Sequence, residues 1–364
     1  FGASTGSLTS LSNGGTPAYT FSWAGPSSYT ATTQNINALV SGTYTLTVTD
    51  VNTCVGTNTI TLTQPNALVT GITSQTVAGG FNITCNGLSN GQISLSNTGG
   101  TPNYSYVWSG PSSFTSTTQN PNNIIAGNYS VVLTDANGCV TSNSITLTQP
   151  NTLVAAASSP TVNGAYNITC YGNNNGTINL NVSGGTSAYT YAWTGTGAYT
   201  GSSQNPSGLV AGTYQVLVTD VNNCTATTSI TLTQPTLLTS SVSSPTFIGN
   251  NNISCNGLLD GAINLSVNGG TSTYSYAWTG PSTFTSNTQN PTGLQAGVYQ
   301  ITTTDANGCV TSSSITLTEP AAMSVNVNSP TFAGGYNISC NGFTNGSINL
   351  TNGGGIPNYS YNWN

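Results

Sequence analysis

Residues 127–150 read GNYSVVLTDANGCVTSNSITLTQP, two alternating segments on either side of a short turn. Apolar side chains lie at alternate positions, Tyr129, Val131 and Leu133 in the first segment and Ile145 and Leu147 in the second. Alternation with a period of two is typical of a β-strand with one buried face. The Asn-Gly pair in the turn favours a tight hairpin, because both residues accept a positive φ. The stretch therefore predicts two antiparallel strands joined by a hairpin.

The same stretch returns with a constant period of 85, without insertion or deletion. The tryptophans show the interval: Trp23, Trp108, Trp193, Trp278 and Trp363. Recent duplication explains a constant length, and so does a constant rise and rotation per repeat. A unit of this length has the size of a domain with its own core. We predict a partial repeat at 1–65, whole repeats at 66–150, 151–235 and 236–320, and a partial repeat at 321–364.

Within 66–150, further alternating stretches are QISLSN and YSYVWSG, and NALVTGITSQT and FNITC supply one or two more strands. About seven short strands with Gly-rich turns are typical of an antiparallel sandwich. The spacing of Leu39, Gly42 and Tyr44 also resembles the tyrosine corner of sandwich domains. We therefore predict an all-β chain, a tandem array of Ig-like or fibronectin-III-like antiparallel β-sandwich domains.

The aromatic stripe of each repeat has two interpretations. Tyr104, Tyr106 and Trp108 share one face of a strand, where they either pack in a core or stack on sugar rings. The residues between them, Ser105 and Val107, are small or polar and suit an outer face. We therefore predict that the aromatic side chains form the core.

The composition excludes several classes of function. The chain has no Lys, Arg or His, six acids and a net charge of −6. Nucleic acids and anionic membranes attract clustered Lys and Arg, so neither is expected as a partner. No apolar run approaches the roughly 20 residues of a membrane span, so no membrane insertion is expected in this stretch. No enzyme is expected either, because apart from Asp260 and Glu319 a repeat offers one acid and no base for paired acid–base chemistry.

One acid recurs in the turn of each repeat: Asp50, Asp135, Asp220 and Asp305. In such a turn its carboxylate would accept backbone N–H bonds. A Ca²⁺ site at these aspartates is the weaker interpretation, because calcium takes six to eight oxygens, usually from several carboxylates. We expect turn chemistry and no cofactor.

Eight cysteines form two interleaved series with the same period: Cys54, Cys139, Cys224 and Cys309, then Cys85, Cys170, Cys255 and Cys340. The chain has no Cys-x-x-Cys pair and no His, which argues against zinc and against a catalytic thiol. All eight are therefore candidates for disulfides in an oxidising, extracellular setting.

Three spacings are open for these disulfides. Most disulfides lie within a domain, which favours Cys85 with Cys139, at a spacing of 54. If these two cysteines lie at opposite ends of a strand of roughly 25 to 30 Å, they are out of reach of each other. Stacked repeats would then favour a spacing of 139, which pairs Cys85 with Cys224 and Cys170 with Cys309. A spacing of 31 is the third alternative.

Asn-x-Ser/Thr sequences recur with the period and are candidate glycosylation sites: Asn82, Asn167, Asn252 and Asn337. Duplication and chance explain most such sequences in a chain this rich in Asn, Ser and Thr. Glycosylation is therefore the minor expectation.

The combined motifs resemble a known family. The patterns C-N-G-x-x-N-G-x-I-x-L, G-G-T-x-x-Y-x-Y-x-W, L-x-A-G-x-Y and T-D-x-N-x-C before I-T-L-T-Q-P look like the SprB-type repeat. That repeat is named after the giant gliding adhesin on the cell surface of Bacteroidota. The resemblance implies a secreted, surface-displayed adhesin or filament, exported by type IX secretion. The lack of Lys and Arg and the long lead-in SSPTVNGAYNITC depart from the family pattern and fit a spacer better than a ligand-binding module.

Two functions compete. The favoured one is a disulfide-stapled rod or spacer outside the cell, whose partners are neighbouring repeats and other copies in a filament. The alternative is a multivalent array that binds surface polysaccharide, with avidity from many weak sites.

Overall fold

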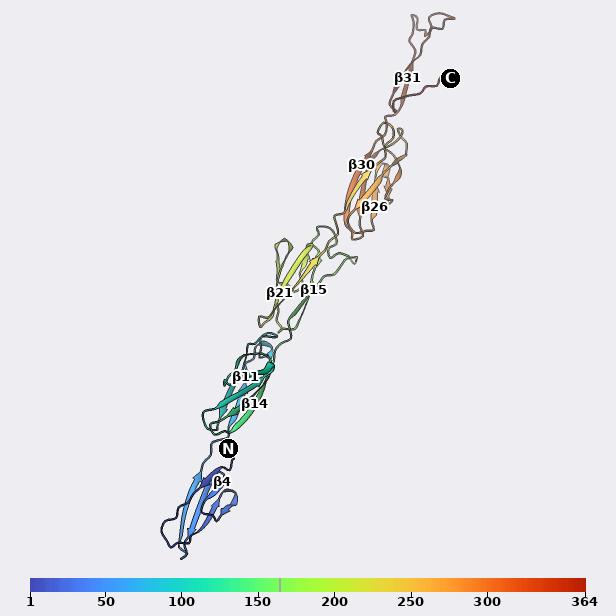
Figure 1. Ribbon diagram of the computed structural model, residues 1–364. Helices are drawn as coiled ribbons and strands as arrows, with labels where there is room; N and C mark the ends of the chain where they lie inside the picture. Colours follow the sequence, from blue (N-terminus) through green and yellow to red (C-terminus); the bar gives the residue numbers. More distant parts are fainter. Residues whose placement is uncertain (164) are drawn as a thin grey trace. The chain divides into compact units, whose positions relative to one another are not determined.

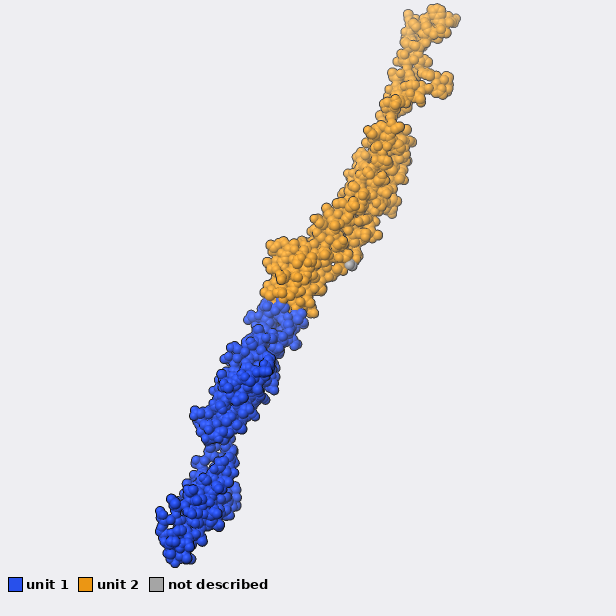
Figure 2. Space-filling view, in the orientation of Figure 1, with its two compact units in different colours: residues 1–154, 183–189, 219–226 blue, residues 155–182, 190–218, 227–364 orange. Residues whose placement is uncertain are grey.

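The computed structural model describes residues 1–163 and 165–364, and its described residues form antiparallel strands and short 3-10 turns (Figure 1). The predicted all-β class is confirmed. The chain divides into two compact units (Figure 2). Unit 1 comprises 1–154, 183–189 and 219–226, and unit 2 comprises 155–182, 190–218 and 227–364. We keep the predicted ranges as names for the repeats, and their boundaries stay predictions.

The first two repeats lie in unit 1. Residues 1–65 form β1 Gly6–Leu8, β2 Thr20–Gly25, η1 Pro26–Ser28, β3 Tyr29–Ala31, β4 Ile36–Leu39, β5 Gly42–Thr49 and β6 Val55–Leu62. Residues 66–150 form β7 Val69–Thr73, η2 Ala78–Gly80, β8 Gly91–Gln92, β9 Ser94–Thr98, β10 Ser105–Gly110, η3 Pro111–Ser113, β11 Phe114–Ser116, β12 Asn122–Ile124, β13 Gly127–Thr134 and β14 Val140–Leu147.

The later repeats follow the same order. Residues 151–235 form β15 Val154–Ser158, β16 Gly176–Thr177, β17 Asn179–Ser183, β18 Thr190–Gly195, η4 Thr196–Ala198, β19 Tyr199–Gly201, β20 Ser207–Leu209, β21 Gly212–Thr219 and β22 Thr225–Leu232. Residues 236–320 form β23 Thr239–Ser243, β24 Gly261–Ala262, β25 Asn264–Asn268, β26 Ser275–Thr279, η5 Pro281–Thr283, β27 Thr285–Ser286, β28 Thr292–Leu294, β29 Gly297–Thr304 and β30 Val310–Leu317. Residues 321–364 form β31 Ser324–Asn328 and β32 Asn349–Gly353.

One sheet of each sandwich has four strands, in the order β11-β10-β13-β14 in repeat 66–150. The strand of Trp108 pairs antiparallel with the following long strand, and Trp108 lies opposite Val131. The hairpin predicted from the opening stretch is present, because β13 pairs with β14 from Gly127 opposite Leu147 to Thr134 opposite Val140. The two predicted strands and their turn are therefore confirmed.

The second layer contains the pairs β7-β9 and β8-β12. We call β7 and its equivalents β15, β23 and β31 the lead strands. Lead strand β7 pairs with β9, with Ile72 opposite Leu95. Asn143 of β14 donates its side-chain N–H to the carbonyl of Thr70 at 3.1 Å, which ties the lead strand to the four-stranded sheet. The lead strand thus closes one side of the sandwich.

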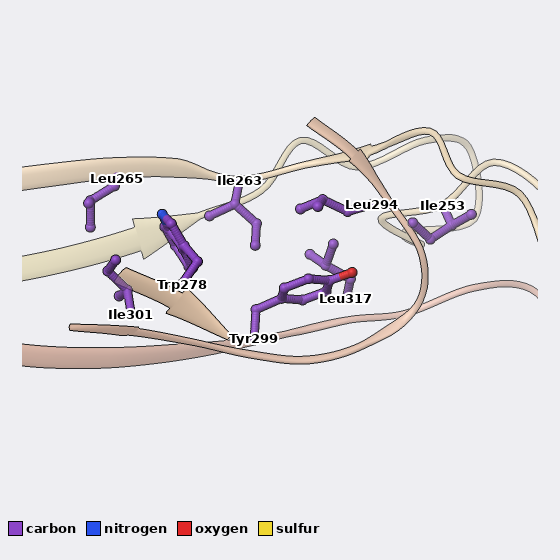
Figure 3. Close-up of a cluster of buried hydrophobic side chains, with 8 residues drawn as sticks. All are labelled: Ile253, Ile263, Leu265, Trp278, Leu294, Tyr299, Ile301 and Leu317. Carbon is purple, nitrogen blue, oxygen red and sulfur yellow. The ribbon is translucent and has the colours of Figure 1, made fainter. Parts of the chain in front are cut away.

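The core lies between the two layers. In unit 1 it contains Trp108, Tyr129 and Val131, each at most 1% exposed. In unit 2 the equivalent cluster is drawn in Figure 3, where Leu265 and Ile263 of one layer face Ile301 and Tyr299 of the other. Burial of each such side chain contributes about 1.5–3 kcal/mol. The prediction that the aromatic stripe forms the core is confirmed for Trp108, and Tyr106 is partly buried against the same core. Tyr104 is only partly buried and is not in this core cluster, and Trp363 of the last partial repeat is 61% exposed.

The predicted tyrosine corner is also present. The hydroxyl of Tyr44 donates to the carbonyl of Val40 at 3.0 Å, and that of Tyr129 donates to the carbonyl of Ile125 at the same distance. Burial raises the pKa of Tyr129, because it disfavours the phenolate. These tyrosines are therefore structural.

The FNITC stretch does not form a strand. Its Ile83 is fully buried, and the N–H groups of Asn82 and Ile83 both donate to the carbonyl of Thr148, at 3.0 and 3.1 Å. The alternation of apolar residues in this stretch therefore reflects a loop that plugs one end of the sandwich.

Candidate functional site

The acid of each turn holds two loops together at one end of its sandwich. In repeat 66–150, one oxygen of Asp135 accepts the N–H groups of Asn137 and Cys139 at 2.9 and 2.8 Å. The other oxygen accepts the N–H group of Thr101, in the Gly-Gly-Thr turn, at 2.9 Å. The predicted turn chemistry is confirmed here, and the same three donors recur at Asp50, Asp220 and Asp305.

These hydrogen bonds change the acidity of the carboxyl groups. The N–H group of Thr101 lowers the pKa of Asp135 below its ordinary value; burial opposes the shift, and the N–H groups of Cys139 and Asn137 add to it. The N–H group of Thr16 likewise lowers the pKa of Asp50. A hydrogen bond to the charged form favours that form.

The donor set does not fit a calcium site. Calcium takes six to eight oxygens, yet the oxygens of the four candidate aspartates already accept three N–H groups each. In the described part of the chain, no group of three or more His, Cys, Asp and Glu is placed to hold a metal ion. The arrangement is that of a carboxylate stabilised by backbone dipoles.

We expect Asp135→Asn to lower stability at neutral pH and to flatten its dependence on pH below about pH 4. The folded pKa lies below the unfolded one, so the carboxylate contributes fully above the unfolded pKa and loses its contribution as the pH falls toward the folded pKa. Melting temperatures from neutral to acidic pH measure this. Asp260→Asn is the matched control, because Asn stands at its position in three other repeats, at Asn90, Asn175 and Asn345. Parallel curves for wild type and Asp135→Asn would contradict the assignment.

In unit 1 the acidic turn of repeat 151–235 meets a loop of repeat 66–150. Cys85 and Cys224 form a disulfide with a Cα–Cα distance of 5.6 Å and a sequence separation of 139. Two residues before Cys224, the side-chain N–H of Asn222 donates to the carbonyl of Ala78 at 3.1 Å and to the hydroxyl of Thr186 at 3.0 Å. One covalent bond and one bridging amide therefore join consecutive repeats.

Unit 2 contains the same junction one period later. Cys170 and Cys309 form a disulfide with the same separation and the same Cα–Cα distance. The side-chain N–H of Asn307 donates to the carbonyl of Thr169 at 3.0 Å, and the side-chain N–H of Asn163 donates to the side-chain oxygen of Asn307. The junction is therefore a repeated feature, with a cysteine and an asparagine from each acidic turn.

The disulfides decide between the three spacings. Both have the spacing of 139, and Cys54, Cys139, Cys255 and Cys340 are free thiols. The favoured spacing of 54 is wrong for Cys85, and the spacing of 31 is not formed among the described cysteines. The spacing of 54 is not formed because Cys85 and Cys139 lie too far apart along the sandwich.

Cys85 and Cys139 flank opposite ends of β14. Asn86, next to Cys85, donates to the carbonyl of Pro150, and Gly87 donates to the side chain of Gln149, beyond the last residue of β14. Cys139 immediately precedes the first residue of the same strand. A strand of 8 residues spans about 26 Å, so the partner of Cys85 comes from the next repeat.

The four candidate glycosylation residues support the loop of the FNITC stretch. The side-chain oxygen of Asn82 accepts the N–H and hydroxyl groups of Thr148, and its N–H donates to the carbonyl of Gln75 at 3.2 Å. Asn167 and Asn252 repeat this pattern with Thr233 and Thr318, and Asn337 donates to Pro330. These side chains have a structural use, and their glycosylation stays a prediction.

Reasoning from the sequence missed Asn222 and Asn307. Their signal was available, because Asn stands two residues after the acid in all four turns, at Asn52, Asn137, Asn222 and Asn307. The aspartate of each turn was predicted as a candidate site, whereas it is the asparagine that makes the contact to the neighbouring repeat. In the part of the chain that the structure describes, no helix is long and apolar enough to cross a membrane.

Several solved structures are similar to parts of the chain. A tetra-tandem repeat from the extending region of a large adhesion protein is 11% identical, with a TM-score of 0.28, over 82% of this chain and 91% of that chain. A Ca²⁺-stabilised adhesin that helps an Antarctic bacterium reach out and bind ice is 14% identical, with a TM-score of 0.33, over 86% and 92%. These TM-scores are low, so the likenesses carry no weight for function. No curated protein matches the sequence.

The family comparison is more specific. Four segments match the SprB repeat: 82–113, 165–198, 251–283 and 336–364. Each of the first three begins at the loop that plugs the sandwich and ends beyond the tryptophan strand, so it contains motifs on which the resemblance was based. The matches recur at about the period of the sequence, and they confirm the resemblance to the SprB repeat in these four segments.

Proposed function

We propose that this array is a spacer in a secreted, surface-displayed bacterial adhesin or extracellular filament. The observation that carries the proposal is the pair of disulfides at one spacing, each of which joins a repeat to the next. A spacer must transmit force between its ends, and a covalent bond at the junction prevents neighbouring sandwiches from separating. The SprB repeats support the coarser statement that the chain is a repeat region of a surface adhesin.

The disulfides also support a location outside the cell. Structural disulfides persist in oxidising compartments and are rare in the cytosol. Export by type IX secretion and a part in gliding belong to the same proposal and rest on the SprB-type resemblance alone.

The alternative, a multivalent polysaccharide-binding array, has less support. Stacking on a sugar ring needs an exposed aromatic face, and Trp108 and Tyr129 are at most 1% exposed. Binding of surface polysaccharide and the lack of enzymatic activity stay predictions.

Deletion of one whole period tests the spacer. Removal of residues 151–235 should leave a folded chain in which Cys85 pairs with Cys309, because the deletion preserves the spacing at the junction. The maximum dimension from small-angle X-ray scattering should fall by about 35–50 Å, the length of one sandwich. The matched control removes 151–230 only, which inserts residues 231–235 between the repeats and should abolish the disulfide. Loss of the disulfide in both variants would contradict the proposal.

A further inference from the structure

Repeat 236–320 has a polar residue in its core where the two preceding whole repeats have an apolar one. Thr303 of β29 is 0% exposed, and so are its equivalents one and two periods earlier, Val218 and Leu133. The hydroxyl oxygen of Thr303 has no hydrogen-bond partner in the part of the chain that the structure describes. A buried hydroxyl without a partner is destabilising, because it has lost its hydrogen bonds to water. This position therefore weakens its repeat.

Thr303 lies at the end of the sandwich that carries the acidic turn. It is the last fully buried residue of β29, and it pairs with Tyr276 of β26 on one side and Thr311 of β30 on the other. Asp305 begins the turn two residues later, and its N–H group donates to the carbonyl of Cys309 at 3.0 Å. The unpaired hydroxyl is therefore buried directly behind the turn.

This turn provides one side of the junction in unit 2. Cys309 is 9% exposed, and its disulfide partner Cys170 is partly buried. The sulfur of Cys309 lies 3.4 Å from the carbonyl oxygen of Thr169, which also accepts the side-chain N–H of Asn307 at 3.0 Å. The rate of reduction of a disulfide depends on access to its sulfur atoms. Access to Cys309 increases when the turn moves away from Thr169.

The buried hydroxyl favours this opening. Water reaches the hydroxyl of Thr303 once the end of the hairpin opens, so the closed hairpin bears a cost that the open hairpin does not. Local openings of this kind have free energies that differ from one region of a protein to another. In the repeat that carries Cys224, the equivalent residue is Val218, which has no hydroxyl and bears no such cost.

We infer that the two junction disulfides differ in lability and that Cys170–Cys309 is the first to be reduced. Reduction then removes the covalent tie of unit 2 while that of unit 1, Cys85–Cys224, stays intact. The junction of unit 2 is thus a redox-sensitive release point, and the stability of the hairpin behind it sets its sensitivity.

The reaction is a thiol–disulfide exchange with a small thiol such as reduced glutathione. The glutathione thiolate attacks one sulfur, the S–S bond breaks, and the other cysteine leaves as a thiolate that takes up a proton. A second glutathione thiolate attacks the mixed disulfide, releases the remaining cysteine and forms glutathione disulfide. The protein disulfide gains two electrons and two protons in total, and two glutathione molecules lose them.

This inference rests on the proposed spacer, because it concerns the release of the same junctions, but the two fail differently. If both disulfides are present in the untreated chain and are reduced at equal rates, the inference is overturned and the spacer stands. If the untreated chain contains neither disulfide, both are overturned.

The test follows reduction of the full chain by a large excess of reduced glutathione at neutral pH. Samples taken over time are quenched by alkylation and digested at aromatic residues. Mass spectrometry then measures the loss of each pair of linked peptides. We expect the pair that contains Cys170 and Cys309 to be lost at least about fivefold faster than the pair that contains Cys85 and Cys224.

Two matched variants separate the buried hydroxyl from other differences between the junctions. Thr303→Val replaces the hydroxyl by a methyl group and should slow reduction of the disulfide of unit 2 at least about fivefold, with the disulfide of unit 1 unchanged. Thr302→Val makes the same replacement at the neighbouring exposed position of β29 and should change neither rate. Equal rates in the two variants, or an equal change at both disulfides in Thr303→Val, would overturn the inference.

Discussion

Under tension, the oxidised chain should stop extending about 600 Å short of the reduced chain. Cys85 and Cys309 have a sequence separation of 309 − 85 = 224, but the two disulfides shorten the covalent path between them to a separation of 224 − 170 = 54. Even when every sandwich is unfolded, the disulfides therefore keep 224 − 54 = 170 residues out of the extended path between the two ends. At about 3.5 Å per extended residue, this gives the expected difference.

Single-molecule force spectroscopy with and without reductant measures this difference. Cys255→Ser is the matched control and should change nothing, because Cys255 is a free thiol in the structure. Cys85→Ser removes one of the two disulfides. The covalent path from residue 85 to Cys309 then runs along the backbone to Cys170, a separation of 170 − 85 = 85 in place of 54, so the oxidised chain should lengthen by about 110 Å. A pairing at the spacing of 54 would instead make Cys255→Ser lengthen the chain, which would contradict the observed disulfides.

Gly99→Ala should have the second large effect, the release of lead strand β7 from its repeat. Gly99 has a φ of +72°, and an added Cβ would lie 1.9 Å from the carbonyl oxygen of Ala67, just before the lead strand. A backbone atom cannot yield as a flexible side chain does, so the segment before the strand must move. We expect a loss of about 3 kcal/mol or more, which lowers the melting temperature by roughly 12 °C or more.

Gly87→Ala separates the clash from backbone strain. Gly87 also has a positive φ, +79°, but nothing lies within 4 Å of an added Cβ. Its substitution should cost only the strain of the left-handed conformation, about 1–2 kcal/mol. Hydrogen exchange at Val69–Thr73 should accelerate in Gly99→Ala and stay slow in Gly87→Ala. Equal melting temperatures for the two variants would disprove the steric explanation.

Much of one repeat could be predicted from the sequence, because its signals are local. Alternation in residues 127–150 specified two paired strands, and the small residues between Tyr104 and Trp108 specified the buried face. Asp135 was predicted in its turn because Asx chemistry reaches only a few residues along the chain. The lead strand and the loop around Ile83 have weaker local signals. The prediction of a strand in the FNITC stretch was wrong, because this stretch forms a buried loop.

The junction could not be derived in the same way. The partner of Cys85 depends on which end of the sandwich each loop occupies, and that depends on the pairing of the whole sheet. Asn222 carries no pattern that separates a contact to Ala78 of another repeat from a contact within its own turn.

The two disulfides interleave, and this makes the connection between the ends redundant. Cys170 lies inside the loop closed by Cys85 and Cys224, and Cys224 lies inside the loop closed by Cys170 and Cys309. A single cut of the backbone anywhere between Cys85 and Cys309 leaves an intact route through one or both bonds. Damage by a protease at one site would therefore nick this part of the chain without severing it.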